Sequence, residues 1–339
     1  MIIMFGNSIY VSDIEDDIIL NKDSDIYFTS FHIAEEFNDS FKDKAIRLLE
    51  ALKRNNKKVI ADLSPRGLKF LGYDSLEKLV KDYCIDYIRF DFGFSEEEII
   101  EASNYCGIVV NASTIEPSFV KKLKGDVIAI HNYYPRKETG LDWGYFRERN
   151  KELKALGIKT GAFIAGDEKK RGPLFEGLPT LEEHRLLKPY VQYCQLRDEV
   201  DLILTGDSGL SEYQQKLITE SEKNDAIMLP VYINKESEYL YGKLFTNRPD
   251  APFWLVRVKE SREYASAGEK IPAKSYALPR NRGTITIDNE KYLRYSGEIQ
   301  IMKENFEADE RVNVIGHINE GYESILECIS RGKKFIFTK

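Results

Sequence analysis

The chain has 339 residues, 42% of them hydrophobic, which is enough for one large domain or two medium ones with a substantial core. Acidic residues outnumber basic ones by 56 to 49, and the formal charge of −7 argues against a nucleic-acid-binding or anionic-membrane surface. The four cysteines have no metal-ligand spacing and are expected as buried free thiols.

No targeting or membrane segment is expected from the sequence. The stretch Met1–Asn7 is apolar but lacks the basic residues that open a signal peptide. No apolar run reaches the length of about 18 residues that a membrane helix needs. We therefore expect a cytoplasmic protein.

Eight short apolar runs with polar ends occur in the first two thirds of the chain. They are Met4–Tyr10, Asp25–Ser30, Lys58–Ser64, Tyr87–Gly93, Gly107–Ser113, Val127–Tyr133, Lys159–Gly166 and Leu202–Asp207. Amphipathic helices are predicted between them, most clearly at Ser40–Asn55, Asp74–Tyr83 and Trp143–Leu156. Eight alternations of strand and helix favour a (β/α)₈ TIM barrel, and a doubly wound open sheet is the alternative. The first crossover, between Tyr10 and Asp25, is short.

The pattern changes after about residue 235, where short β-rich runs separated by turn residues replace the alternation. These runs are Phe253–Val258, Gly283–Asp288, Tyr292–Tyr295, Glu298–Met302, Val312–Ile318 and Lys334–Thr338. We therefore expect a barrel domain at residues 1–235 and a small all-β domain at residues 236–339.

The third and fourth predicted strands end in charged residues. Asp62 closes the third strand, while Arg89 and Asp91 lie on the same face of the fourth because side chains alternate along a strand. Two carboxylates at adjacent strand ends could act as a general acid and a nucleophile or base. The structural alternative is an ion pair that fills the centre of the barrel.

The fifth and sixth strands end in polar and aromatic residues. Asn111 could bind a sugar hydroxyl, or it could close its loop by bonding to the backbone. His131, Asn132 and Tyr134 follow the sixth strand, and Arg136 comes shortly after them. We expect these side chains to position a substrate, with Arg136 as a cation for a phosphate.

Two further carboxylates, Glu182 and Asp207, lie after the seventh and eighth strands and are candidate catalytic groups. Thr180 and Glu183 fit a capping box, so the segment around Glu182 could serve only to start a helix. The four histidines are scattered and match no zinc motif, so we expect neither a metal ion nor a cofactor.

Six strings along the chain resemble the signature blocks of one bacterial family. They are Ile88–Gly93 (IRFDFG), His131–Leu141 (HNYYPRKETGL), Gly177–Arg185 (GLPTLEEHR), Arg282–Asn289 (RGTITIDN), Tyr295–Ile301 (YSGEIQI) and Asp309–Gly316 (DERVNVIG). The family is that of the 6-phospho-N-acetylmuramidases, formerly called "outer surface" proteins. The resemblance implies a TIM barrel, a C-terminal cyclophilin-like barrel, and hydrolysis of MurNAc-6-phosphate–GlcNAc in peptidoglycan recycling.

This implied substrate gives the candidate residues their expected roles. Asp62 and Asp91 would be the central acids, and Arg89 and Arg282 would bind the phosphate or the lactyl carboxylate. The partner is then a phosphorylated amino-sugar disaccharide, without nucleic acid or membrane, and a homodimer is left open. Two alternatives stay open as well: a metal-dependent sugar-phosphate isomerase or epimerase, and a non-catalytic phosphosugar-binding protein.

One departure from the family pattern leaves the non-catalytic phosphosugar-binding protein open as an alternative. Relatives often follow the first-strand Ser-x-Tyr with Pro-Glu, whereas here Ser8–Tyr10 is followed by Val11 and Ser12. If that glutamate takes part in catalysis elsewhere, this chain has an altered substrate or a reduced activity.

Overall fold

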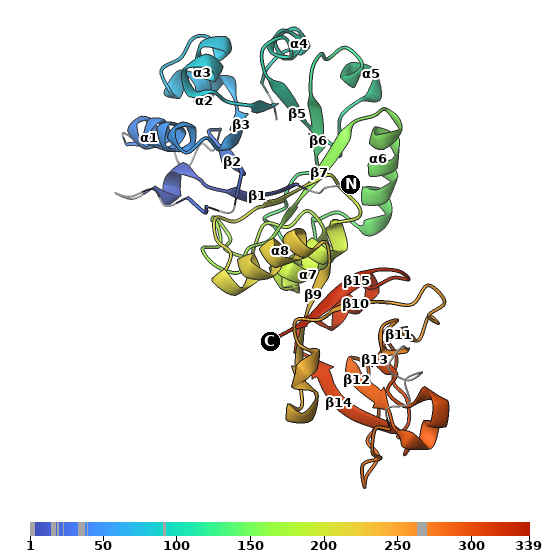
Figure 1. Cartoon of the computed structure of the whole chain (residues 1–339). Coiled ribbons are helices and arrows are strands. Elements are labelled where there is room, and N and C mark those ends of the chain that lie inside the picture. The colour runs from blue at the N-terminus through green and yellow to red at the C-terminus, as the bar shows by residue number, and fades with distance from the viewer. Residues whose placement is uncertain are drawn as a thin grey trace. The chain divides into compact units, whose positions relative to one another are not determined.

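The computed structural model describes residues 4–14, 18, 20–22, 24–32, 38, 40–90, 93–262 and 270–339. The chain divides into two compact units, Met1–Glu212 and Tyr213–Lys339 (Figure 1). Each unit has its own sheet, and we describe them separately.

The sheet of the first unit is a closed barrel of parallel strands, in which each strand pairs with the next along the chain and the last pairs with the first. The strands are β1 (Met4–Ser8), β2 (Ile26–Ser30), β3 (Lys58–Leu63), β4 (Tyr87–Phe90), β5 (Gly107–Asn111), β6 (Val127–Ile130), β7 (Lys159–Ile164) and β8 (Leu202–Thr205). This closure confirms the predicted (β/α)₈ barrel and removes the open sheet.

Helices surround the barrel strands on the outside (Figure 1). They are α1 (Phe41–Arg54), α2 (Pro65–Phe70), α3 (Leu76–Tyr83), α4 (Glu96–Ala102), α5 (Pro117–Val120), α6 (Trp143–Ala155) and α7 (Pro189–Leu196), with 3₁₀ segments η1 (Val11–Asp13) and η3 (Glu182–Leu186). The next helix, α8 (Glu212–Asn224), opens the second unit. The predicted helices at Ser40–Asn55, Asp74–Tyr83 and Trp143–Leu156 are confirmed. Within the described ranges, no helix has both the length and the apolar composition that crossing a membrane requires.

The predicted capping box at Thr180 is wrong. The Thr180 hydroxyl donates to the Asn132 carbonyl at 2.9 Å and accepts from the Phe163 backbone N–H at 2.9 Å. The following turn, η3, is a short 3₁₀ helix that begins after Leu181 without a side-chain cap. Thr180 therefore ties a loop to the barrel and does not start a helix.

Alternation along the strands decides which side chains enter the barrel. Phe28, Ile60, Ile128 and Phe163 pack together inside, and the rings of Phe28 and Phe163 meet edge-on at 5.2 Å. Residues one position away, such as Tyr27, belong to the separate core between the strands and the outer helices. Because side chains alternate with a period of two, the position of a polar residue at the end of a strand decides whether its side chain faces the barrel interior or the outer helices.

The second unit is built mainly on a seven-stranded sheet in the order β10-β15-β9-β14-β12-β13-β11. The strands are β9 (Ile227–Ile233), β10 (Leu244–Thr246), β11 (Leu255–Arg257), β12 (Thr284–Asp288), β13 (Ile299–Met302), β14 (Val312–Ile318) and β15 (Lys334–Thr338), with 3₁₀ helices η4 (Lys235–Leu240), η5 (Glu290–Tyr295) and η6 (Glu323–Cys328). A second, sheet-based domain is thus confirmed. Strand β9 lies in it, while the expected division after residue 235 stays a prediction.

Two smaller expectations are corrected. The run Tyr292–Tyr295 is part of η5 and not a strand, because the Asn289 side chain accepts from the Lys291 N–H at 3.0 Å and starts a helical turn. The cysteines are free, but Cys84 is exposed and only Cys194 is buried. Cys84 ends α3 in a left-handed conformation, which takes its side chain away from the core.

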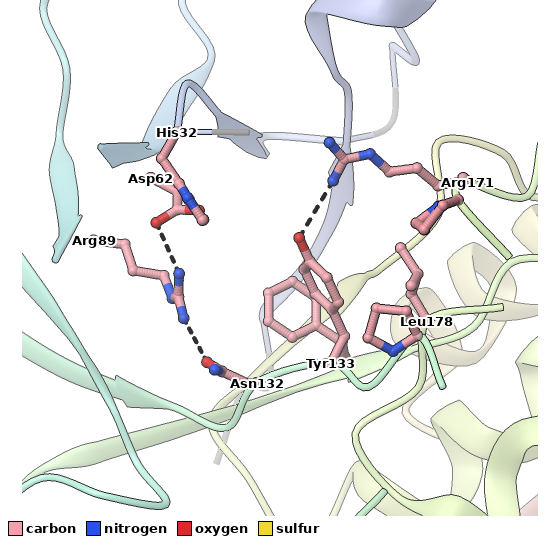
Figure 2. A pocket seen from close by; sticks show the side chains of 11 residues that line it. His32, Asp62, Arg89, Asn132, Tyr133, Arg171 and Leu178 are labelled. Atoms are coloured by element: carbon pink, nitrogen blue, oxygen red, sulfur yellow. Dashed lines mark hydrogen bonds and ion pairs between the residues drawn. The ribbon is translucent and has the colours of Figure 1, made fainter. Parts of the chain in front are cut away.

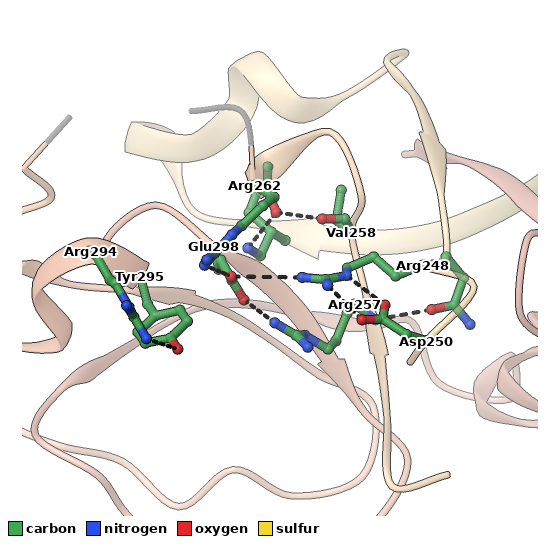
Figure 3. A network of polar contacts seen from close by, with 11 residues as sticks. Arg248, Asp250, Arg257, Val258, Arg262, Arg294, Tyr295 and Glu298 are labelled. Atoms are coloured by element: carbon green, nitrogen blue, oxygen red, sulfur yellow. Dashed lines mark hydrogen bonds and ion pairs between the residues drawn. The ribbon is translucent and has the colours of Figure 1, made fainter. Parts of the chain in front are cut away.

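A buried carboxylate in the second unit is held by arginines (Figure 3). Glu298 accepts from Arg257 Nη2 at 2.8 Å and from Arg262 Nη1, and Arg248 Nη1 lies 4.0 Å away. A buried charge is costly unless it is paired and hydrogen-bonded. These guanidiniums give Glu298 that pairing and join β11 to the turn before β13.

Gly6, in β1, allows the close approach of β2 and β8. A Cβ atom there would lie 2.4 Å from Ile26 Cγ2, 2.8 Å from the Ile26 carbonyl oxygen and 2.8 Å from Leu204 Cδ2. We expect Gly6→Ala to lower the free energy of unfolding by about 1–3 kcal/mol through overpacking. Denaturant unfolding measures this, with Gly144→Ala in α6 as control, where only one side-chain oxygen lies at 3.0 Å. Equal stability of both variants would contradict the close packing at Gly6.

Candidate active site

A pocket of about 290 Å³ lies at the carboxyl ends of the barrel strands, where (β/α)₈ proteins place their sites (Figure 2). Its lining comes from the ends of β2, β3, β4 and β6, from β7, and from the loop that follows β7. The lining residues are His32, Asp62, Arg89, Asn132, Tyr133, Pro135, Phe163, Arg171, Gly172, Pro173 and Leu178.

An ion pair between Asp62 and Arg89 forms one wall of this pocket (Figure 2). Arg89 Nη1 lies 2.7 Å from Asp62 Oδ1, and the side chains are only 6% and 2% exposed. The Ser30 hydroxyl donates to Asp62 Oδ2 at 2.9 Å, and Arg89 Nη2 donates to the Asn132 side chain. The network links the ends of β2, β3, β4 and β6 and fixes the carboxylate in one orientation.

Of the two expectations for Asp62 and Arg89, the ion pair is observed, and the roles in catalysis and binding stay predictions. The two residues form the ion pair at the barrel centre, and both also line the pocket. Asp62 thus lines the pocket while Arg89 and Ser30 donate to its two oxygens, and a carboxyl group held in this way is a candidate nucleophile or general base. Asp91, the second expected acid, lies outside the described residues.

The opposite wall contains a second guanidinium. Arg171, in the loop after β7, lies over the Tyr10 ring at 3.5 Å. Its guanidinium donates to the Tyr133 hydroxyl at 3.3 Å (Figure 2). Burial raises the pKa of both phenols, so they stay neutral at ordinary pH. The described lining residues thus combine one carboxylate with two guanidiniums, which favours an anionic ligand.

Several lining residues were missing from the sequence prediction. His32 follows β2 after one intervening residue, Phe31, and its Nε2 lies 3.7 Å from Asp62 Oδ2. It carries the same signal as Asp62, a polar residue after an apolar strand, and could have been included. Tyr133 follows Asn132 and packs edge-on against Phe163 at 5.1 Å. Arg171 lies in a loop without periodicity, where sequence gives no orientation.

His131 points away from the pocket. Residues Ile128 and Ile130 of β6 face the barrel interior, so Asn132 continues that face and His131 takes the other. His131 is fully buried beneath α6, between the Ser113 hydroxyl at 2.9 Å from Nδ1 and Asn150 Oδ1 at 3.1 Å from Nε2. Burial lowers its pKa to about 4. The expected substrate contact of Asn132 fits the pocket, whereas His131 supports the strand behind it.

The other expected binding residues lie outside the lining of this pocket. Asn111 Oδ1 accepts from the Ser113 N–H at 3.0 Å, which is the loop-closing alternative. The Tyr134 N–H donates to the Pro179 carbonyl at 3.0 Å, and Arg136 is exposed. Arg282 belongs to the second unit, where it donates to the Lys303 carbonyl at 2.7 Å and pairs with Glu327.

Glu182 is paired and bonded on both oxygens. Arg185 Nε and Nη2 donate to its two oxygens at 2.6 and 2.7 Å, and the Gly140 N–H donates at 2.8 Å. The hydrogen bonds from Arg185 lower the pKa of Glu182 to about 2. A general acid needs a raised pKa. Glu182 is therefore suited to joining the loops after β6 and β7, and its catalytic role stays a prediction.

Asp207 is also fully occupied. Its Oδ2 accepts from the backbone N–H groups of Gly166 at 2.9 Å and Leu178 at 3.1 Å, and its Oδ1 accepts from that of Arg171 at 2.9 Å. Burial raises its pKa, although these bonds oppose the shift.

Among the described residues, no group of three or more His, Cys, Asp or Glu side chains is arranged to hold a metal ion.

The fold and the pocket define a (β/α)₈-barrel protein with a polar, ligand-sized site at the strand ends and a C-terminal sheet domain. The chain belongs to the 6-phospho-N-acetylmuramidase family: the models of its N-terminal and C-terminal parts match residues 5–220 and 227–338. No curated protein matches this chain.

Two solved structures are similar over the full length. A conserved Enterococcus faecalis protein of unknown function is 32% identical, with a TM-score of 0.83 over 99% of this chain and 96% of its own. An uncharacterised B. cereus protein is 25% identical, with a TM-score of 0.78 over 100% of both chains. The two-part architecture is therefore shared with these proteins.

Buried His131 makes the stability of the barrel sensitive to acid. Its folded pKa of about 4 lies below the ordinary value of 6.5, so the unfolded chain binds the proton first as pH falls. The stabilisation is present above pH 6.5 and is lost toward pH 4. From pH 7 to pH 4.5, we expect wild type to lose about 2 kcal/mol more unfolding free energy than His131→Gln.

Denaturant unfolding at the two pH values measures this difference. His317→Gln, which removes an exposed histidine of the second unit, is the control and should keep the wild-type slope. A wild-type slope in His131→Gln would show that this imidazole is not held neutral.

Proposed function

We propose that this protein is a glycoside hydrolase that cleaves MurNAc-6-phosphate–GlcNAc during peptidoglycan recycling in the cytoplasm. The observation that carries the proposal is the pocket itself, in which an oriented carboxylate and two guanidiniums meet at the barrel mouth. Membership of the 6-phospho-N-acetylmuramidase family supports the same substrate.

Cleavage of a glycosidic bond needs a carboxylate on one side of the sugar and a proton donor for the leaving oxygen. Asp62 supplies the carboxylate, and its bonds to Arg89 and Ser30 hold it still. Such preorganised charge stabilises the oxocarbenium-like transition state without further reorganisation. We assign Asp91, two residues after Arg89 in the sequence, as the acid and base partner.

The remaining lining suits the rest of the substrate. The rings of Tyr133 and Phe163 offer flat apolar surface for a sugar ring, and Asn132 offers an amide beside it. Asp62 is among the lining residues of the pocket, whereas Glu182 and Asp207 are not. We therefore place the chemistry on Asp62 and Asp91 and give Glu182 and Asp207 supporting roles.

No arrangement among the described residues favours the metal-dependent isomerase or epimerase. The non-catalytic phosphosugar-binding protein differs from the hydrolase in one observable, turnover. Val11 and Ser12, which depart from the family pattern, lie in η1, where Val11 is buried and Ser12 is exposed. Asp13 follows them, and its carboxylate accepts from the Tyr10 N–H at 2.9 Å. Release of GlcNAc by the wild-type chain would exclude the binding protein.

Asp62→Asn tests the assignment. The amide keeps the size of the side chain and removes its negative charge, so we expect turnover of MurNAc-6-phosphate–GlcNAc to fall by about 10²–10⁴. The control is Asp126→Asn, an exposed carboxylate just before β6 at the other end of the barrel, 3.3 Å from Lys159 Nζ. It should keep wild-type turnover.

The measurement is the rate of GlcNAc release, with thermal unfolding to show that both variants fold. Full turnover in Asp62→Asn would remove Asp62 from the chemistry. If the wild-type chain releases no GlcNAc from the disaccharide, the proposed function is wrong.

A further inference from the structure

Polar side chains gather on one face of three neighbouring strands of the second unit, β12, β13 and β11. In the antiparallel pairing of these strands, Thr286 and Arg257 both lie opposite Gln300. Asp288, two residues after Thr286, lies opposite Glu298, whose carbonyl accepts from the Asp288 N–H at 2.9 Å. Paired residues and residues two apart share a face of a sheet. We call these five side chains the polar face.

Three side chains of the polar face have hydrogen-bonding capacity that the described residues leave unused. Thr286 is fully buried, and its hydroxyl has no partner among those residues. The same holds for the buried Nε–H of Arg257, although Nη2 of this guanidinium donates to Glu298 at 2.8 Å (Figure 3). Asp288 is 4% exposed, and no donor in the described ranges bonds to its carboxyl group. Buried polar groups are costly unless they are bonded, so a ligand that bonds to them recovers free energy.

The polar face also contains side chains that solvent reaches. The Arg257 side chain is 23% exposed, and Gln300, which lies between Arg257 and Thr286 in the pairing of the strands, is half-buried. Arg248 and Arg262, which approach Glu298, are partly exposed as well (Figure 3). The buried groups of the polar face therefore lie next to side chains that a dissolved ligand can contact.

The charges on the polar face favour a neutral ligand with hydroxyl groups. An ammonium group would bond to Asp288 but not to the Arg257 Nε–H, which needs an acceptor. An anion would bond to Arg257 but approach two carboxyl groups, Asp288 and Glu298. Burial, and then the charge of Glu298, raise the pKa of Asp288 to about 7, so its carboxyl group can donate as well as accept near neutral pH. A hydroxyl group also donates and accepts, and a sugar offers several of them.

We propose that the polar face of β12, β13 and β11 binds a neutral sugar through hydrogen bonds to Thr286, Asp288 and Arg257. These residues are not among the described lining residues of the barrel pocket. The proposal therefore gives the second unit a carbohydrate-binding function of its own. It does not depend on the hydrolysis proposed above, because binding to the polar face requires no turnover.

The test is a titration of the isotope-labelled full chain with N-acetylglucosamine, in which NMR follows the backbone amides of β12 and β13. Each amide reports on its own surroundings, so the affinity obtained belongs to the polar face. We expect saturable shifts of these amides in the wild-type chain. Thr286→Val keeps the shape of the side chain and removes its hydroxyl, so we expect it to lower this affinity by about 3- to 10-fold, the range of one neutral hydrogen bond.

Thr338→Val is the matched control, because Thr338 lies in β15, which β9 and β14 separate from β12 in the sheet. It should keep the wild-type affinity. Thermal unfolding adds a second readout, since Thr286→Val removes a buried hydroxyl that the described residues do not bond. Its unfolding midpoint should therefore stay the same or rise while its affinity falls. A lower midpoint would show that this hydroxyl supports the fold, and would overturn its role in binding.

Two charged sugars test the class of ligand. Glucosamine carries an ammonium group, and N-acetylglucosamine 6-phosphate carries a phosphate. Both should bind to the polar face more weakly than N-acetylglucosamine. Tighter binding of either charged sugar at these amides would overturn the assignment of a neutral ligand. If none of the three sugars shifts the amides of β12 and β13, the polar face is not a sugar site and the proposal is wrong.

Discussion

The ion pair between Asp62 and Arg89 is the interaction on which the mouth of the barrel depends. Two charges buried this deeply are costly to remove from water, and the cost is offset only when the geometry is good and the remaining donors and acceptors are bonded. Here Ser30 donates to Asp62, and Arg89 donates to Asn132, which gives each member of the pair one further bond. Four strand ends are thereby fixed around one carboxylate, which gives the pocket an oriented negative charge.

The carboxylates of the barrel differ in what their side chains do. Asp207 and Glu182 use both oxygens to hold the loops after β6 and β7, and each is linked to an arginine, Arg171 or Arg185. Asp62 is held as firmly but also lines the pocket. Acidic residues at strand ends thus serve two purposes in this barrel, and their bonding partners tell the purposes apart.

The barrel could be predicted from sequence because strand and helix alternate with regular periods and each strand is short and apolar. Asp62, Arg89 and Asn132 could be found because their strands fix the face on which they lie. The same two-residue period, applied to β6, would have turned His131 outward. Arg171 could not be found, since a loop without a period gives no direction and its orientation depends on contacts with residues far away in sequence.

A crystal structure of the chain with MurNAc-6-phosphate–GlcNAc bound, in an Asp62→Asn variant, tests the central claim most directly. The account predicts electron density for the sugar in the pocket between residue 62 and Tyr133, with the glycosidic oxygen on the side of residue 62. Density for the disaccharide away from residue 62 and Tyr133 would contradict the account.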